Sequence, residues 1–456
     1  MLDCCCKLMR RGYMQRVRVW RRPLHAKRGQ TMSDPALMRK IGWRLLPLLF
    51  AGYTLSIIDR VNISFAREPM SADIGLSAAA FGFGAGLFFL VYCAFEVPSN
   101  ALLVRFGARV WLARIMVTWG LLTMVMAWVQ TPLHFYAMRA LLGAAEAGFY
   151  PGVVYLLSAW FPDRHRAAAL SLLMLGGPVA GIIVGPLSMH ILLHLDGVMG
   201  FKGWQWLFLL QGAPAVVMAG VLYRWLADSP QHASWLDRHE RDALQRSLGQ
   251  DSACERGEGR FWDVLSDLHF WRLALALATV YLGVYSVMFW LPALLQQKGA
   301  VGMQALGWMT IAPYVASLLL MPLLAFSSDR LDERRWHIGA ALLLAVGGIL
   351  AALWLARDGV GLLLGLSVAY AGITSTIPLI WSMVGKRYQG SQSALTIALI
   401  NTIASLGSFA GPWLLGIGQQ LTGSLLTPMC AVAVSLGVGA LLIVKGGEPT
   451  PELSLR

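Results

Sequence analysis

Charged residues are scarce in this sequence. Only 13% of its 456 residues are Asp, Glu, Lys or Arg, whereas 57% are hydrophobic. A soluble globular domain has roughly twice that charged fraction, so the composition argues against a large soluble protein. Long apolar runs recur between Trp43 and Val444, each close to the roughly 20 residues that a helix needs to cross a bilayer. Because the runs are continuous rather than alternating, we expect membrane-spanning α-helices.

Cysteine is also scarce, and the cysteines form no recognisable site. The six are Cys4, Cys5, Cys6, Cys93, Cys254 and Cys430. None has metal-ligand spacing with a histidine, and no disulfide framework is evident. The sequence therefore predicts no metal site and no cofactor. A membrane enzyme would need a nucleophile–base pair or a metal cluster, and none is found, so we do not expect an enzyme.

The first 31 residues are rich in arginine and lack the apolar core of a secretory signal peptide. Met32-Ser33-Asp34-Pro35 stands directly before a basic flank and the first apolar run, which is typical of a translation start. Two interpretations stay open: residues 1–31 are a disordered extension, or the start is assigned too far upstream. Under the first interpretation Cys4 to Cys6 are candidates for palmitoylation, and under the second they are an artefact of the reading frame. We expect residues 1–40 to form a basic extension.

The net charge of +13 is distributed as in a membrane protein rather than a nucleic-acid-binding one. Twelve of the 37 Lys and Arg residues precede Leu45, and nine of the others fall in the short loops on one side of the predicted spans, against four in the loops on the other side. Basic loops remain in the cytoplasm during insertion, so this asymmetry predicts that both termini are cytoplasmic. We expect a multi-pass protein of the bacterial inner membrane that functions as a monomer, with the lipid bilayer as its surroundings and no nucleic acid as a partner.

Twelve spans are predicted from the hydrophobic stretches and from the Gly, Pro and charged residues that separate them. They fall near residues 44–66, 78–103, 111–130, 133–158, 167–193, 205–227, 270–292, 305–327, 337–356, 360–385, 392–418 and 424–444. A polar segment, 229–268, separates an N-terminal half, 41–228, from a C-terminal half, 269–445, and a tail follows at 446–456. The predicted fold class is an all-α membrane protein with two six-helix halves.

The two halves show an internal repeat. Arg105 corresponds to Arg330, an offset of 330 − 105 = 225, and Pro186 corresponds to Pro412, an offset of 412 − 186 = 226. Such a parallel duplication places a substrate site near the middle of the membrane between the halves, which rock to expose it to each side in turn.

Five ionisable residues stand out in the interiors of the predicted spans, all in the first half: Asp59, Arg60, Glu96, Arg139 and Glu146. Charges at this depth are costly and usually carry function, although a structural ion-pair network holding two spans together is the open alternative. Arg60 is the candidate ligand for an anion, because its planar fork can grip a carboxylate with two hydrogen bonds. Asp59 and Glu146 are the candidate proton carriers, since burial disfavours a charged carboxyl. Arg139, at a matching depth, is the predicted counter-ion of Asp59.

Polar and aromatic residues in other spans can complete the site. Tyr53 lies two turns before Arg60 on the same helix face, and Asn401 is a lone amide in the eleventh span. Tyr285 and Trp381 can wall the cavity, since binding sites are mostly apolar with few polar contacts. For each aromatic residue, ordinary packing is the alternative. Glu96 lies near the predicted cytoplasmic end of its span, where we expect a gating or structural role.

Two loops carry matching basic motifs. Ser328-Asp329-Arg330-Leu331-Asp332-Glu333-Arg334-Arg335 resembles the loop signature of the major facilitator superfamily, and residues 104–109 resemble a first copy without its usual Asp. The resemblance implies the twelve-helix fold and gating roles for Arg105, Asp329 and Arg330.

Further motifs resemble the anion:cation symporter family within that superfamily. They are Asp59-Arg60-Val61-Asn62, Glu96-Val97-Pro98-Ser99-Asn100 and the run from Arg139 to Glu146. The resemblance implies that the matching Asp and Glu are linked to protons and that the Arg of the first span is central to substrate binding. It also implies tartrate-like, aromatic or sugar acids as substrates, and the aromatic residues favour an aromatic or short hydroxy acid.

The sequence therefore predicts a secondary transporter whose partners are a small organic anion and a proton, taken up together by alternating access. A drug–proton antiporter is the nearest alternative, because residues 181–186 resemble an element of exporters, although Leu187-Ser188 then replaces the usual Gly-Gly. An anion uniporter or exchanger stays open, since proton linkage is inferred from carboxyl positions alone. A non-transporting receptor is disfavoured by the set of intramembrane charges.

Overall fold

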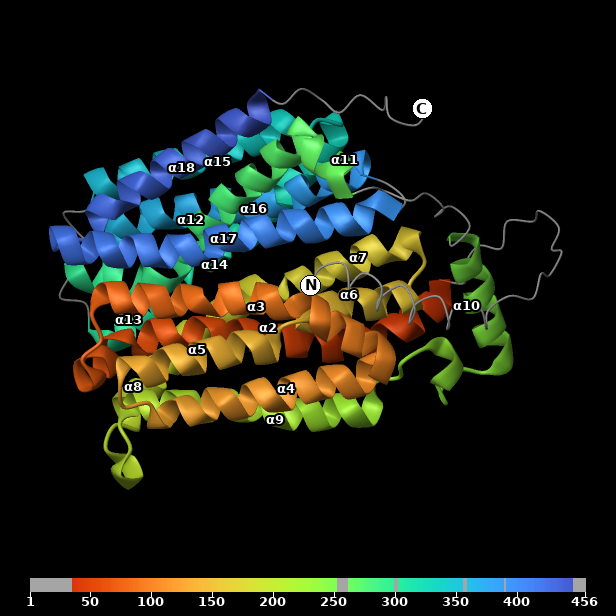
Figure 1. The fold of residues 1–456 in the computed structure, drawn as a ribbon, viewed down its shortest axis with the longest axis horizontal. Coiled ribbons are helices and arrows are strands. Elements are labelled where there is room, and N and C mark those ends of the chain that lie inside the picture. The colour runs from red at the N-terminus through yellow and green to blue at the C-terminus, as the bar shows by residue number, and fades with distance from the viewer. Residues whose placement is uncertain (1–34, 252–260, 299–301, 356–358, 389–390, 446–456) are drawn as a thin grey trace.

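Twelve helical segments that are long and apolar enough to cross a membrane dominate the computed structural model (Figure 1). The structure describes residues 35–251, 261–298, 302–355, 359–388 and 391–445, and this part of the chain contains no strand. The predicted tail, most of the predicted N-terminal extension and Cys4 to Cys6 lie outside the described residues. The prediction of twelve spans is confirmed.

The first six spans comprise α2 (Pro35–Ile74), α3 (Ala78–Phe106), α4 (Ala108–Val125), α5 with α6 (Pro132–Glu146, Phe149–Trp160), α7 with α8 (Asp163–Met174, Gly176–His194) and α9 (Gly203–Trp225). The last six comprise α12 (Leu268–Lys298), α13 with α14 (Met303–Met309, Ala312–Leu331), α15 (Arg335–Trp354), α16 (Gly359–Arg387), α17 (Ser391–Thr422) and α18 (Leu426–Val444). Short helices in the connections are η2 (Met126–Trp128), η3 (Val198–Gly200), η4 (Pro230–His232), α10 (Arg238–Asp251) and α11 (Phe261–Ser266).

The two ends of the bundle differ in what they carry. In Figure 1 the spans run across the view, with α10 and α11 at the right end and α13 at the left. We call these the α10 end and the α13 end. Helices of the first half, coloured red to yellow-green, lie below those of the second half, coloured green to blue. The predicted spans are too short at several termini, because helices such as α2 continue into polar sequence beyond their apolar stretch.

Helix pairs repeat between the halves. Helix α3 packs on α5 and α4 on α9 in the first half, as α14 packs on α16 and α15 on α18 in the second. Across the halves, α3 packs on α17, and α8 packs on α13. At the first crossing Gly82 faces the carbonyl of Pro412, and at the second Gly185 faces Gly307 and Thr310. Gly82 on α3 and Gly307 on α13 are 307 − 82 = 225 residues apart, which is the offset of the internal repeat. The two crossings are therefore equivalent. The repeat inferred from the sequence thus reappears as paired contacts.

The close approach at Gly185 predicts a large effect of any added side chain. A Cβ there would collide with Thr310 and the Gly307 carbonyl, so Gly185→Val is expected to lower the free energy of unfolding by about 1–3 kcal/mol through overpacking. Gly177, on the same helix, faces open space where a Cβ would lie, and Gly177→Val is the matched control with an expected effect below about 0.5 kcal/mol. Thermal unfolding in detergent measures both, and equal stabilities of the two variants would contradict the packing argument.

Candidate functional site

Arg60 and Glu146 form a buried ion pair between α2 and α5. Arg60 Nε donates to Glu146 Oε1 at 2.8 Å, and Nη2 lies 2.5 Å from the same oxygen. Only 12% of the Arg60 side chain and 4% of the Glu146 side chain are exposed. The structure therefore brings the candidate anion ligand and a candidate proton carrier into direct contact.

Glu146 is held at a break in its span. Helix α5 ends at Glu146, Gly148 adopts a left-handed conformation with φ of 87°, and α6 starts at Phe149. A side chain at position 148 would be strained in this conformation and would meet Ser99 of α3. Interrupted helices are typical of transport sites near the membrane centre, because the ends of the two half-helices supply backbone polar groups there. The sequence predicted one continuous helix over 133–158, and the structure corrects this at the position of the candidate acid.

Asp59 is buried beside this pair but is not hydrogen-bonded to it. Its Oδ2 accepts a hydrogen bond of 2.7 Å from Trp119 Nε1 on α4, and its Oδ1 has no hydrogen-bond partner within the part of the chain that the structure describes. The carboxyl is close enough to Glu146 to interact electrostatically with it. Sequence inspection missed Trp119, because a tryptophan within an apolar span carries no distinguishing signal.

The predicted pairing of Arg139 with Asp59 is wrong. Arg139 donates instead to the backbone carbonyls of α3, from Nη2 to Ala85 at 3.2 Å and from Nε to Gly84 at 3.4 Å. Its guanidinium lies 4.9 Å from the centre of the Phe88 ring. The physical reason is that α5 packs directly on α3, so the inward face of α5 at this level meets α3 and not α2. Matching depth alone did not specify the neighbouring helix.

Tyrosines and one phenylalanine surround the Arg60 guanidinium. The Phe88 and Tyr92 rings lie 5.4 and 5.2 Å from it, and Tyr285 of α12 also interacts with it. Tyr285 packs on Phe89 with ring centres 4.3 Å apart. The predicted residues Tyr53, Tyr285 and Trp381 belong to this cluster, since Tyr53 interacts with Arg60 and Tyr285, and Trp381 interacts with Tyr281.

Three further tyrosines of this cluster were missed from the sequence, namely Tyr92, Tyr150 and Tyr370. Tyr150 packs on Tyr53 with ring centres 5.6 Å apart. Tyr370 on α16 interacts with Tyr53 and Tyr285. The cluster therefore draws on both halves, through α2, α3 and α6 on one side and α12 and α16 on the other. We call Arg60, Glu146, Asp59 and these aromatic residues the central site.

Asn401 and Glu96 contact each other across the two halves. The Asn401 amide donates to the Glu96 carboxylate at 3.2 and 3.4 Å, which joins α17 to α3. Cys93 Sγ approaches the Thr402 carbonyl at 3.9 Å on the same interface. The amide that the sequence offered as a substrate ligand is thus engaged by an acid, and a direct role in binding stays a prediction.

The predicted gating residues of the loops lie at the α10 end. Asp329 pairs with Arg334 at 2.5 Å, and Arg334 Nε donates to Ser382 Oγ of α16 at 2.7 Å. Arg105 lies over the Phe106 ring at 5.5 Å, and Arg330 is exposed. These contacts are local to each half, so gating by Arg105, Asp329 and Arg330 stays a prediction.

A second polar cluster at the α10 end was missed from the sequence. Asp267 lies directly before α12, where its Oδ1 accepts from the backbone N–H of His269 at 2.9 Å and its Oδ2 accepts from Tyr388 Oη at 2.5 Å. Partial burial acts to raise the pKa of Asp267, but the bonds from Tyr388 and His269 and the nearby Arg387 guanidinium outweigh it and lower the pKa below its ordinary value. The cluster fastens the start of α12 to the end of α16.

At the α13 end, Arg67 joins the halves. It donates to Gln419 Oε1 of α17 at 2.9 Å and lies 4.4 Å from the centre of the Trp290 ring of α12. Trp290 Nε1 in turn donates to the Pro412 carbonyl at 3.1 Å. The sequence placed Arg67 in a loop, because it lies just outside the predicted apolar run. Direct contacts therefore connect the halves at this end.

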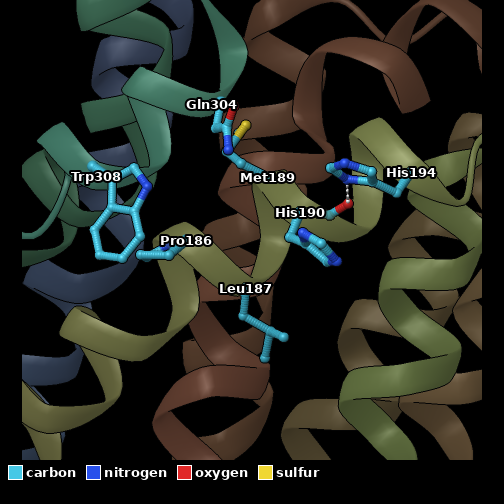
Figure 2. Close-up of a pocket in the computed structure, with 7 residues that line it drawn as sticks. All are labelled: Pro186, Leu187, Met189, His190, His194, Gln304 and Trp308. Atoms are coloured by element: carbon cyan, nitrogen blue, oxygen red, sulfur yellow. Dashed lines mark hydrogen bonds between the residues drawn. The ribbon is translucent and has the colours of Figure 1, made fainter.

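A cavity of about 300 Å³ also opens at the α13 end, between α8 and α13 (Figure 2). Its lining residues are Pro186, Leu187, Met189, His190, His194, Gln304 and Trp308. The two histidines are exposed, their ring centres lie 4.2 Å apart, and His194 Nδ1 is 3.0 Å from the His190 carbonyl. None of the central-site residues lines this cavity. Within the described ranges, no three His, Cys, Asp or Glu residues are grouped so that they could hold a metal ion.

Comparison with known proteins agrees with this architecture. The family model described as the Major Facilitator Superfamily matches residues 49–412 and, in a second match, residues 273–455. A protein of Agrobacterium vitis provisionally named as a tartrate transporter is 38% identical over 421 residues, covering 92% of this chain and 93% of that protein. A protein of Acinetobacter baumannii named quinolone resistance transporter is 37% identical over 409 residues, covering 89% and 94% of the two chains.

Among solved structures, a bacterial homologue of the human lysosomal transporter Spinster, in an inward-facing and occupied conformation, matches with a TM-score of 0.73. The match covers 89% of this chain and 97% of that one at 17% sequence identity, and it concerns the fold alone. The fold, the family model and the relatives confirm the resemblance stated from the loop and span motifs, and they describe a transporter rather than an enzyme. This multi-pass membrane protein belongs to the major facilitator superfamily.

Proposed function

We propose that this protein takes up a small organic carboxylate together with protons. The observation that carries the proposal is the ion pair between Arg60 and Glu146, buried at mid-span and surrounded by tyrosines from both halves. When Glu146 binds a proton, its carboxyl loses the charge that holds the guanidinium. An incoming carboxylate can then take its place on Arg60 through charge-assisted hydrogen bonds. Proton and anion would thus have to be present together, which is the requirement for symport.

Asp59 supplies a second acid for the same path. One of its oxygens has no hydrogen-bond partner among the described residues, although the residue is only 8% exposed. A buried carboxyl with a free oxygen can accept a proton without breaking another bond. We assign Asp59 to proton transfer beside Glu146, with Arg139 holding α5 against α3 so that Glu146 stays in place.

The proposed orientation in the membrane follows from the distribution of basic side chains. Basic side chains gather at the α10 end, among them Arg105, Arg109, Arg330 and Lys386. By the positive-inside rule this end faces the cytoplasm, which places both termini there and the protein in a bacterial inner membrane. Arg67 and its partners would then close the outer side, and a monomer would suffice for alternating access.

Proton-coupled efflux of a drug-like compound is the second candidate. It is favoured by the relative named quinolone resistance transporter, whose identity to this chain is almost equal to that of the tartrate-named relative. The ion pair weighs against export of cations, because Arg60 would repel them, but it does not weigh against export of an anion.

Purified protein in proteoliposomes separates the two candidates. With the exterior acidified, we expect radiolabelled carboxylate to accumulate inside above its external concentration, and a protonophore to abolish the accumulation. A quinolone such as norfloxacin should show no transport driven by the same gradient. The proposal would be overturned in favour of efflux if the quinolone moved in the direction opposite to the protons and no carboxylate of a panel were taken up.

A further inference from the structure

We propose that the central site accepts one carboxylate group only, and therefore selects monocarboxylates with an aromatic or hydroxylated body over dicarboxylates. This inference rests on the proposed function and names its substrate class. Three observations support it: the number of cations facing the site, the screening of the second arginine, and the surplus of acids.

Arg60 is the cation that three tyrosines of the site and Glu96 share, whereas Arg139 interacts electrostatically with Glu146 and Arg60. Within the described part of the chain, it is the positive group that interacts with Tyr53, Tyr92, Tyr285 and Glu96, and no other cation is a partner of these four side chains. One guanidinium can bind one carboxylate with its fork. A second carboxylate on the same substrate would therefore need another donor of positive charge.

Arg139 does not provide that second charge. Two of its nitrogens are occupied by the Gly84 and Ala85 carbonyls, and only 2% of the residue is exposed. The Phe88 ring contacts both guanidiniums, with Arg139 at 4.9 Å and Arg60 at 5.4 Å from its centre. Phe88 is itself 2% exposed, and its ring contacts both arginines. This ring, together with the carbonyls that occupy Arg139, would keep a substrate bound to Arg60 from the second cation.

The acids of the site oppose a dianion. Glu146, Asp59 and Glu96 all lie within electrostatic range of the central site. When Glu146 is protonated, a monoanion replaces its charge on Arg60 one for one. A dianion would leave one buried carboxylate without a positive partner and near Asp59 and Glu96, which is strongly unfavourable.

The remaining wall specifies the body of the substrate. Tyr53, Tyr281, Tyr285 and Trp381 present flat rings together with hydroxyl and indole donors from three helices. Ring faces favour stacking with an aromatic group, and the hydroxyls can hydrogen-bond to a substrate hydroxyl. An aromatic or hydroxylated monocarboxylate satisfies both features.

Matched acid pairs test the inference. In each pair one compound is a dicarboxylate and the other is its monoamide, so that the two differ in one charge: phthalate with phthalamate, and malate with malamate. Competition against a transported carboxylate in proteoliposomes at pH 7 is expected to favour the monoamide at least tenfold in each pair. Equal or stronger competition by the dicarboxylates, still lost in Arg60→Lys, would overturn the inference while the proposed function stands. Failure of every carboxylate to accumulate would overturn both.

Phe88 variants give a second measurement. Phe88→Ala is expected to expose Arg139 and to reduce the preference for the monoamide at least fivefold, whereas Phe88→Leu keeps an apolar screen and the preference. If Phe88→Ala does not fold, the matched pairs on the native protein still decide. An unchanged preference in folded Phe88→Ala would contradict the screening role of this ring.

Discussion

Arg60→Lys is expected to lower carboxylate accumulation in proteoliposomes by about 10- to 100-fold. Arg60 uses two nitrogens against a single carboxylate oxygen of Glu146, and a substrate carboxylate would meet the same fork. A lysine has one compact ammonium group and cannot reproduce this geometry. Losing one charge-assisted hydrogen bond costs roughly 1.5–3 kcal/mol, and each 1.4 kcal/mol is a factor of ten in affinity.

Lysine is chosen because it preserves the positive charge. Removing the charge would leave Glu146 buried without a partner, which destabilises a fold by roughly 3–5 kcal/mol and would confuse loss of binding with loss of structure. Arg44→Lys is the matched control, since Arg44 lies on the same helix but is exposed and contacts Trp235 near the α10 end. Wild-type accumulation by Arg60→Lys would show that Arg60 is not the anion ligand.

The membrane fold was predictable because lipid imposes a simple rule on composition. Each span needs a continuous apolar run, and the runs were visible without any tertiary information. Helix breaks were not predictable in the same way. The segment from Ala144 to Gly152 is apolar throughout apart from Glu146 and Tyr150, so hydropathy cannot locate the interruption at Gly148. Gly148 also lies so close to Ser99 of α3 that a side chain would collide with it, which is a feature of tertiary packing.

The sequence predicted which residues form the candidate site better than it predicted which of them contact one another. Asp59, Arg60 and Glu146 stood out because ionisable groups are rare in apolar spans, and the structure brings Arg60 and Glu146 together. Depth along a helix gives one coordinate only, so Arg139 was matched to an acid at its level although its side chain meets α3. Tyr92 and Trp119 could not be identified, since aromatic residues are ordinary components of spans. Which aromatic residues contact the buried charges depends on how the helices pack, and the sequence pattern does not show this.

Glu146→Gln is expected to abolish accumulation driven by a pH gradient and to retain exchange. Glutamine has nearly the size of glutamate and can accept a hydrogen bond from Arg60, but it cannot bind and release a proton. Arg60 would then be free for the substrate at every pH, because no carboxylate competes for it. Concentrative uptake should fall at least tenfold, whereas counterflow of labelled against unlabelled substrate should stay within about threefold of the wild type, a change of less than roughly 1 kcal/mol.

The contrast between the two assays is what makes this variant informative. A loss of both activities would indicate that the Glu146 carboxylate holds the structure of the central site, for example by orienting Arg60, and a thermal unfolding measurement would then show a lowered midpoint. Glu240→Gln is the control, since Glu240 also pairs with a basic residue, Lys40, but at the α10 end and away from the central site. Concentrative uptake at the wild-type level by Glu146→Gln would rule out Glu146 as the coupling acid. The proton would then have to be carried by Asp59, which interacts electrostatically with Glu146 and whose Oδ1 has no hydrogen-bond partner among the described residues. Asp59→Asn in the same two assays would be expected to show the loss of coupling instead.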